Sequence, residues 1–485
     1  MKSHAAVNRL RLTCSETPPA MPNQSKTDAV SRVDHDHVGR MFAGERARFD
    51  ASHGKSKDLF ARGKESFLYG TPSHWMRRWS GGFPIYVAEA SGTRLVDVDG
   101  NVYTDFCLGD TGGMCGHGHP AIANAVAHQL RSSASTMLPT AASLWVGEEL
   151  TRRFGLPYWN LATSATDANR AAIRLSRMIT GRDKVLVFNG CYHGAVEEAH
   201  VELRDGRMGL RNDIHPNGVD HQRVSKVVEF NDRDALQSAL APRDVACVLT
   251  EPAMTNCGMV LPDPGYHDFL RTATRQTGTV LIIDETYTIS AGPGGFSLVH
   301  GLEPDIFVIG KAIGGGIPCA VYGLSRMIAE RVWTVFPPVD PAVKQSAHGG
   351  FGGTLAGNAI AVAAIEATLK DVLTYEAFAR MIGFANDLAD DAVAQITEAG
   401  LAWQVSRIGV RVEYMFHPRR PHNGGEARAA RDGALEILLH LYFLNRGVIL
   451  TPFHNMLLLC PASSSEDVDH HRVVFATFIA ELMRR

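Results

Sequence analysis

The sequence predicts an α/β fold: a mainly parallel central sheet covered by helices, plus a smaller α+β domain built from both chain ends. Between residues 120 and 365, helically spaced segments alternate with short runs that are apolar throughout. Such runs are typical of strands buried on both faces of a parallel sheet. The clearest are KVLVF (184–188), VACVLT (245–250), TVLIID (279–284) and DIFVIG (305–310). We assign residues 120–365 to the large domain.

The N-terminal part shows shorter periodic segments. Residues 1–40 include a polar stretch without the apolar core of a signal peptide, and we expect a flexible extension there. Amphipathic helices are expected within 37–53 and 56–70. An antiparallel meander is expected at 83–109, with Asp-Gly-Asn as a turn. Residues 41–119 are therefore expected to contribute to the small domain.

The C-terminal part predicts the rest of that domain. An alanine-rich helix is expected at 356–373, bridging to residues 366–485. In chain order, this last region should contain a strand at 409–416, a helix at 425–446, two further strands and a terminal helix. The two further strands are expected at 448–453 and 456–460.

Composition excludes several classes of function. The 485 residues are 45% apolar and 20% charged, with a net charge of −3, so no overall field favours nucleic acid or an acidic membrane. No run of about eighteen apolar residues predicts a spanning helix. The eight cysteines are scattered without metal-ligand spacing, which favours reduced thiols, a cytoplasmic location and no metal site.

Polar residues end four of the apolar runs. Asp284, Lys311 and Glu251 each follow a strand, and Tyr192 with His193 follows another. In α/β sheets, ligands bind beyond the carboxyl ends of the strands, so these groups should share one rim. Each has an ordinary explanation when taken singly, as a turn, a cap, a packing residue or a solvated lysine. Their combination favours a binding site.

An amine and a carboxylate at one rim suit pyridoxal phosphate (PLP). PLP needs a lysine for its Schiff base and a carboxylate that keeps the pyridine nitrogen protonated, roles for Lys311 and Asp284. Tyr192 could stack on the ring. The phosphate needs N–H donors at a helix start, where Ser164, Ala165 and Thr166 stand, although an ordinary N-cap explains these residues as well.

Longer motifs carry a family resemblance. The stretches IIDETYT, PDIFVIGKAIGGGIP, FNGCYHG, EPAMTNCGMVLPDPGY and GGTLAGNAIAVAA resemble, in order and spacing, the class III aminotransferases of PLP fold type I. The resemblance covers about residues 60–480. Its nearest branch contains glutamate-1-semialdehyde aminomutase and the β-amino-acid transaminases. It implies a fold-type I PLP-dependent transferase.

The resemblance also implies roles for individual residues. Lys311 would form the Schiff base and shuttle the proton, and Asp284 would pair with the pyridinium nitrogen. Thr354 would reach the cofactor phosphate of a neighbouring subunit, which implies a homodimer. The other residues implied at the cofactor are Ser164, Ala165, Thr166, Tyr192, His193, Glu251, Asn256 and Thr286.

Two stretches depart from the family pattern. The usual Ser-Gly-Thr-Glu-Ala is here Ser164-Ala165-Thr166-Asp167-Ala168, which should still bind phosphate. After Asp-Glu the family usually has Val and then Met, Gln or Ile, whereas this chain has Thr286 and Tyr287. Thr286 would replace an aliphatic contact on the ring face opposite Tyr192.

A substrate carboxylate calls for an arginine. The candidate substrate-binding residues are His74, Trp75, Arg77, Arg78, Arg411, Phe453 and His454. Surface exposure explains the arginines equally well, and core packing explains the aromatic residues.

Three functions follow as hypotheses. The first is an aminotransferase that moves an amino group from an amino acid, with β-amino acids among the donors, to a keto acid. The alternative is an intramolecular aminomutase of the glutamate-1-semialdehyde type. The third is a catalytically silent protein with the same fold, against which the presence of Lys311, Asp284 and Tyr192 argues. A nucleotide phosphate loop is excluded, because such a loop has its glycines before the lysine, whereas here the glycines follow Lys311.

Overall fold

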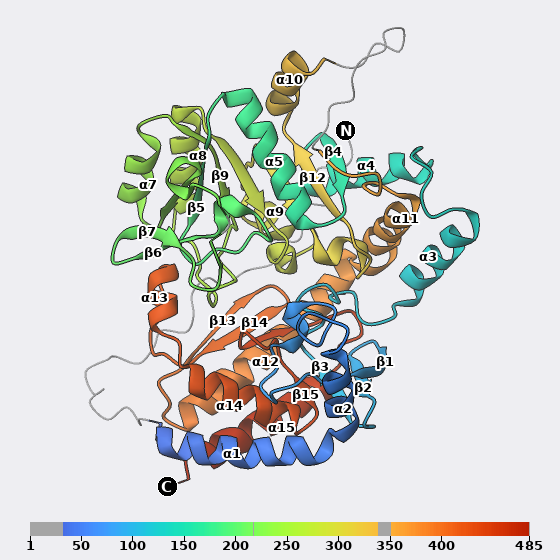
Figure 1. Ribbon diagram of the computed structural model, residues 1–485, viewed down its shortest axis with the longest axis vertical. Coiled ribbons are helices and arrows are strands. Elements are labelled where there is room, and N and C mark those ends of the chain that lie inside the picture. Colours follow the sequence, from blue (N-terminus) through green and yellow to red (C-terminus); the bar gives the residue numbers. More distant parts are fainter. Residues whose placement is uncertain (1–32, 217, 338–350, 485) are drawn as a thin grey trace.

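The computed structural model describes residues 33–216, 218–337 and 351–484. A seven-stranded sheet forms the centre of the upper part of the molecule in Figure 1. All of its neighbouring pairs are parallel except those made by β12, which runs antiparallel to both neighbours. In spatial order its strands are β4 (Tyr158–Ala162), β12 (Ala320–Leu324), β11 (Ile306–Ile309), β10 (Val280–Asp284), β9 (Val245–Thr250), β5 (Lys184–Phe188) and β8 (Ser225–Val228).

Helices cover this sheet, as the apolar runs predicted. Every residue of β9, β10, β11 and β12 is buried, which is the pattern of strands enclosed on both faces. The helices of this part are α3 (Pro120–Ser132), α4 (Ala142–Phe154), α5 (Ala165–Thr180), α6 (His221–Val224), α7 (Arg233–Leu240), α8 (Tyr266–Thr277), α9 (Gly295–His300), α10 (Arg326–Val335) and α11 (Ala359–Ala367). The α/β fold class is confirmed.

A smaller part joins both chain ends, at the bottom of Figure 1. β3 pairs with β15 in parallel, with Thr104 opposite Val448, and α1 packs on α14. Its strands are β1 (Val87–Ser91), β2 (Arg94–Asp97), β3 (Val102–Asp105) and β15 (Val448–Ile449) in one sheet, and β13 (Gln404–Ile408), β14 (Arg411–Met415) and β16 (Met456–Leu458) in another. Its helices are α1 (His35–Ser52), α2 (Gly54–Gly63), α12 (Tyr375–Glu398), α13 (Gly424–Ala429), α14 (Gly433–Leu444) and α15 (Ser465–Leu482).

Several predicted elements differ in extent. The helix expected at 425–446 is two helices, because the Asp432 side chain accepts from Leu435 N (3.1 Å) and starts α14 anew. The helix expected at 356–373 is α11 followed by a π-helical turn, Thr368–Val372. The strand expected at 448–453 stops at Ile449, shortly before Pro452, which cannot donate a hydrogen bond to a sheet.

Short elements complete the described chain. β6 (Val201–Arg204) and β7 (Arg207–Leu210) form a hairpin. Short helices lie at η2 (His74–Arg77), η3 (Glu197–Ala199), η4 (Thr288–Ala291) and η5 (Lys311–Gly314). No helix of the described residues is long and apolar enough to cross a membrane. Of the extension expected at 1–40, residues 1–32 lie outside the described part, and α1 begins at His35. The domain boundaries stay predictions.

Candidate active site

Lys311 and Asp284 lie at the same edge of the central sheet. β10 and β11 run in parallel, with Asp284 opposite Val308. The next residue, Glu285, donates its backbone N–H to Val308 O (2.8 Å) and extends the pairing. Lys311 starts η5 just beyond the end of β11. The carboxylate and the amine therefore lie at the carboxyl ends of two neighbouring strands.

Gly310 brings the lysine against the start of α5. A Cβ atom on Gly310 would lie 2.7 Å from Ala165 Cβ, so only glycine permits this approach. The Gly310 N–H donates to Thr286 Oγ1 (3.2 Å), so the Thr286 hydroxyl supports the backbone that leads to the lysine. Lys311 itself has a left-handed φ of 45°, a conformation that costs a non-glycine residue about 1–3 kcal/mol.

Asp284 is a buried carboxylate with three donors. His193 Nδ1 lies 3.0 Å and Asn169 Nδ2 2.8 Å from Oδ2, and Thr286 N donates to Oδ1 (3.0 Å). Burial raises the pKa of Asp284, but the hydrogen bond and charge of His193 outweigh it and lower that pKa overall. Burial acts to lower the pKa of His193, and the bond to Asp284 raises it overall. The two side chains therefore form an ion pair.

The start of α5 presents free N–H groups. The first intrahelical bond runs from Ala168 N to Ser164 O (3.0 Å), so the N–H groups of Ala165 and Thr166 precede it. The Ser164 hydroxyl accepts from Asp167 N (3.2 Å) as the N-cap. Thr166 Oγ1 accepts from Ala195 N (3.1 Å) in the loop that carries Tyr192 and His193. Such a helix start is suited to binding a phosphate.

These groups fit PLP. An ionised carboxylate has about four acceptor sites, and the three donors at Asp284 leave one for a protonated ring nitrogen. His193 Nε2 is buried and has no partner among the described residues. The Lys311 side chain is 28% exposed, which leaves its amine within reach of a ligand. Gly310, next to Lys311, contacts both Ala165 at the start of α5 and Thr286, two residues after Asp284.

Tyr192 lies in an aromatic cluster with Trp75 and Phe453. The Trp75 ring lies edge-on to Tyr192, with centroids 5.8 Å apart, and tilted against Phe453 at 5.3 Å. The His74 ring contacts Trp75 at 4.5 Å. Burial raises the pKa of Tyr192, so its hydroxyl stays protonated at neutral pH. The cluster links η2 and the segment around Phe453 to the loop after β5.

The two arginines after Trp75 diverge. Arg78 lies over the Trp75 ring, with Cζ 4.6 Å from its centroid. Arg77 lies over the ring of Tyr69 (4.2 Å) instead. Arg78 is thus the arginine that the structure brings to the aromatic cluster.

The remaining expected residues lie as follows. Glu251 is buried and accepts from Asn256 Nδ2 (3.0 Å) and Thr255, and burial raises its pKa. Thr354 lies exposed in a turn ahead of α11. His454 is buried near Glu413, with Nδ1 3.8 Å from Oε1, and burial lowers the pKa of this histidine to about 3. His454 is therefore neutral.

Asp110 is a site residue that the sequence did not reveal. Lys311 Nζ lies 2.8 Å from Asp110 Oδ2, and the Tyr287 hydroxyl donates to the same oxygen (2.5 Å). Lys311 Nζ also lies 3.7 Å from the centroid of the Tyr287 ring. Asp110 belongs to a glycine-rich stretch, CLGDTGGM, which we call the 107–114 loop. An acidic residue between glycines was the available signal.

Arg411 is fully buried behind Tyr287. Its Nη2 donates to Thr111 Oγ1 (2.7 Å), Nη1 contacts Met456 Sδ, and Cζ lies 4.7 Å from the Tyr287 ring centroid. Nε has no partner, and no ion pair to Arg411 is found in the described ranges. Burial lowers the pKa of Arg411. A buried guanidinium without an ion pair is costly, which favours a role in binding an anion.

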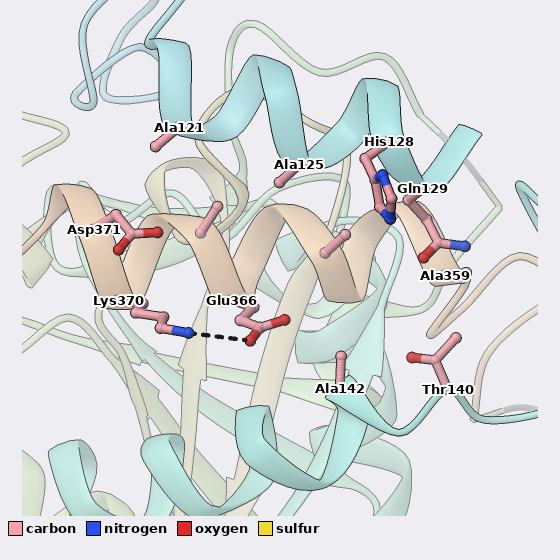
Figure 2. Close-up of a pocket in the computed structure, with 12 residues that line it drawn as sticks. Ala121, Ala125, His128, Gln129, Thr140, Ala142, Ala359, Glu366, Lys370 and Asp371 are labelled. Carbon is pink, nitrogen blue, oxygen red and sulfur yellow. Dashed lines mark ion pairs between the residues drawn. The ribbon is translucent and has the colours of Figure 1, made fainter. Parts of the chain in front are cut away.

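A separate cavity lies between α3, α4 and α11. Figure 2 shows its lining, which includes His128, Gln129, and the ion pair of Lys370 with Glu366 (3.8 Å). Its volume is about 210 Å³. None of its lining residues is among those that surround Lys311.

Comparisons with known proteins show the family to which the chain belongs. The family model Aminotransferase class-III matches residues 75–476. The chain is 30% identical over 423 residues to a glutamate-1-semialdehyde 2,1-aminomutase from Anaeromyxobacter dehalogenans, covering 85% of this chain and 95% of that protein. A relative of the same name from Roseiflexus castenholzii is 32% identical over 404 residues, 82% of this chain and 90% of that protein.

Two solved structures give the same picture. A glutamate-1-semialdehyde aminomutase from Pseudomonas aeruginosa PAO1 is 53% identical with a TM-score of 0.91, covering 93% of this chain and all of that chain, and a variant of it is in complex with PMP. A β-phenylalanine aminotransferase from Variovorax paradoxus is 25% identical with a TM-score of 0.80, covering 91% and 97%.

Proposed function

The chain belongs to the class-III aminotransferases and is a PLP-dependent enzyme of fold type I, and from this premise we propose that it is an aminomutase of the glutamate-1-semialdehyde type. It would move an amino group between two positions of one substrate. The observation that carries the chemistry is the contact of Gly310, next to Lys311, with Ala165 at the start of α5, at the edge where Asp284 lies. The names of the relatives favour this outcome over transfer to a separate keto acid, which the sequence analysis put first.

The proposed mechanism assigns one task to each group. Bound here, PLP supplies an electron sink for charge that develops at the amino-bearing carbon. Lys311 Nζ would hold the cofactor covalently and, once a substrate amine replaces it, take the proton from that carbon and return it. Asp284, ionised through its pair with His193, would keep a proton on the ring nitrogen.

Other residues would orient the cofactor. The helix start at Ser164, Ala165 and Thr166 would bind the phosphate. Tyr192 and Thr286 would lie against the ring. Glu251 is assigned to the O3′ side with Asn256, to which it is hydrogen-bonded.

The substrate carboxylate is assigned to Arg411. Its guanidinium is buried, contacts Tyr287 beside Lys311 and has one N–H without a partner among the described residues. His74 and Trp75 would form the outer wall. Arg77 is a weaker candidate, because it lies over Tyr69 rather than over the aromatic cluster.

A second candidate is transfer from an amino acid, a β-amino acid included, to a keto acid. The cluster of Trp75, Tyr192 and Phe453 favours it, since aromatic side chains suit an apolar substrate group. The β-phenylalanine aminotransferase among the structural relatives supports the same candidate.

We also propose a homodimer in which Thr354 reaches the cofactor phosphate of the other subunit. Thr354 is exposed, and large apolar side chains are exposed on and after α3, at Leu130, Met137, Leu138 and Leu144. Exposed apolar area of this kind is typical of a protein interface. A cytoplasmic location remains a prediction.

Turnover with a single substrate tests the proposal. Purified holoenzyme is given glutamate-1-semialdehyde alone, and its isomerisation without any keto acid is the expected result. Turnover that starts only when an amino donor and a keto acid are both present would establish the second candidate instead. The Lys311→Ala variant serves as the blank, because it lacks the proposed covalent attachment.

A further inference from the structure

The loop that carries Asp110 approaches Lys311 from outside the central sheet. We propose that Asp110 is a positioning residue, which holds the Lys311 amine as an ammonium whenever this amine is not bound to the cofactor. The proposal rests on the proposed function, since it takes Lys311 as the residue that binds PLP. It adds a group from the 107–114 loop to a site otherwise formed at the ends of strands.

The contacts of Asp110 suit it to binding the Lys311 ammonium. Its Oδ2 accepts from Lys311 Nζ at 2.8 Å and from the Tyr287 hydroxyl at 2.5 Å, so the hydroxyl fixes the oxygen that the amine binds. Its Oδ1 is buried and has no partner among the described residues. Burial raises the pKa of Asp110, but the charge and the hydrogen bond of Lys311 outweigh it and lower that pKa overall. The carboxylate is therefore ionised and ready to hold a cation.

The backbone on both sides of this pair is strained. Leu108, Asp110 and Thr111 have φ values of 44°, 53° and 78°, and Lys311 has 45°. Left-handed non-glycine residues are uncommon and cluster where a fold holds a functional group in place. Both members of the ion pair therefore occupy conformations that the surrounding structure must enforce.

The base of the loop is anchored by another carboxylate. Asp105 Oδ1 accepts from the N–H groups of Cys107 (2.8 Å) and Leu108 (2.9 Å), and Oδ2 lies 2.7 Å from His117 Nε2. These bonds hold the strained segment between β3 and α3. The position of Asp110 is thus set by the loop as well as by its bond to the lysine.

The proposal has a consequence for the capture of PLP. The Lys311 ammonium must first lose one proton to solvent. The neutral amine then forms a C=N bond to the aldehyde carbon, and the aldehyde oxygen leaves as water with the two amine hydrogens. A carboxylate that stabilises the ammonium slows this step, because it opposes the loss of the first proton. Removing the carboxylate should speed capture.

The test measures the rate at which the full chain, freed of cofactor, captures PLP at pH 7.5. Visible absorbance follows the reaction in the wild type, Asp110→Asn and Asp110→Gly. Both substitutions tolerate the left-handed φ at this position, so the loop can be kept. We expect capture to be about tenfold faster in both variants. Damage to the site would slow capture, so a gain in rate separates positioning from a structural role.

A matched control removes another nearby carboxylate. Asp213→Asn breaks an ion pair with Arg211 (2.9 Å) that does not involve Lys311, and its capture rate should equal that of the wild type. Unchanged or slower capture by both Asp110 variants, with native circular dichroism, would overturn the proposal. The capture of PLP needs no substrate, so the proposal about Asp110 can be tested even if the aminomutase assignment fails. A wild type that captures no PLP would instead refute the function on which it rests.

Discussion

The edge of the central sheet and the 107–114 loop both supply a carboxylate to the site, and they hold it in different ways. Asp284 is the last residue of the regular buried strand β10 and has three hydrogen-bond donors. Asp110 lies on a strained loop, and one of its oxygens has no partner in the described chain. The strand end therefore supplies the carboxylate proposed for the cofactor, and the loop supplies a carboxylate that binds the lysine itself.

Removing Lys311 should have the largest effect, because both carboxylates act through its amine or its cofactor. We expect Lys311→Ala to lower turnover by about 10⁴-fold or more, since covalent attachment and proton transfer are both lost. Steady-state assays with added PLP measure this loss. Lys370→Ala, in the separate cavity of Figure 2, is the control and should keep wild-type turnover. Appreciable turnover without Lys311 would refute its role.

Neutralising Asp284 should have the next largest effect. Asp284→Asn keeps the size of the side chain but loses the charge that would hold a proton on the ring nitrogen. We expect kcat to fall by about 10²–10³-fold, the loss that follows removal of one preorganised electrostatic partner. Asp244→Asn is the matched control, because Asp244 pairs with Lys184 and Lys226 and follows no strand at this edge. Equal kcat values for the two variants would contradict the assignment.

The difference between these regions explains what the sequence could predict. Asp284, Lys311 and Tyr192 were found because an apolar strand ends just before each, and parallel strands end at a common edge. Asp110 was missed, because its only signal was an acidic residue between glycines, and a loop has no period that gives its direction in space. Arg411 was expected to bind substrate, but no sequence pattern indicated that Tyr287 would lie against it.

Secondary structure shows the same limit. The strands and helices of the sheet follow from apolar spacing, whereas the break between α13 and α14 depends on one capping residue, Asp432. Caps and turns are local hydrogen bonds, which a periodic pattern does not reveal. The proposed approach of Thr354 to a second subunit depends on contacts between two chains. The spacing of residues within one chain does not predict such contacts.

Arg411 allows a smaller test of the loop, because Thr111 holds its guanidinium. We expect Arg411→Gln to raise KM for a carboxylate substrate by about 10–100-fold, the range for losing a hydrogen bond to a charged group. Affinity for PLP should change little. Arg326→Gln, whose guanidinium lies over the Tyr158 ring, is the control and should leave KM unaltered. If KM stays constant while the melting temperature falls, Arg411 serves packing alone.

The last prediction concerns stability rather than turnover, at the support beneath the loop. His471 packs against Phe106, just before the 107–114 loop, and burial lowers the pKa of His471 to about 3. In the unfolded chain this side chain binds a proton below about pH 6.5. Its contribution to stability is therefore complete above that pH and is lost as the pH falls toward 3, by up to about 1.4 kcal/mol per pH unit.

His471→Leu removes this titration and tests its sign. Melting temperatures from pH 7 to pH 4.5 should decline less steeply in the variant than in the wild type. His422, which pairs with Asp263 at the surface, provides the matched control. The melting temperature of His422→Leu should decline with pH as steeply as that of the wild type. If the melting temperature of His471→Leu declined as steeply as that of the wild type, other groups would be responsible for the loss of stability at low pH.

The central claim is that PLP is bound to Lys311. Reducing the holoenzyme with borohydride and mapping its peptides by mass spectrometry tests this directly, because reduction makes the attachment permanent. We predict that the phosphopyridoxyl group is found on the peptide that contains Lys311. A label on a different lysine, or no label on a protein saturated with PLP, would contradict the account.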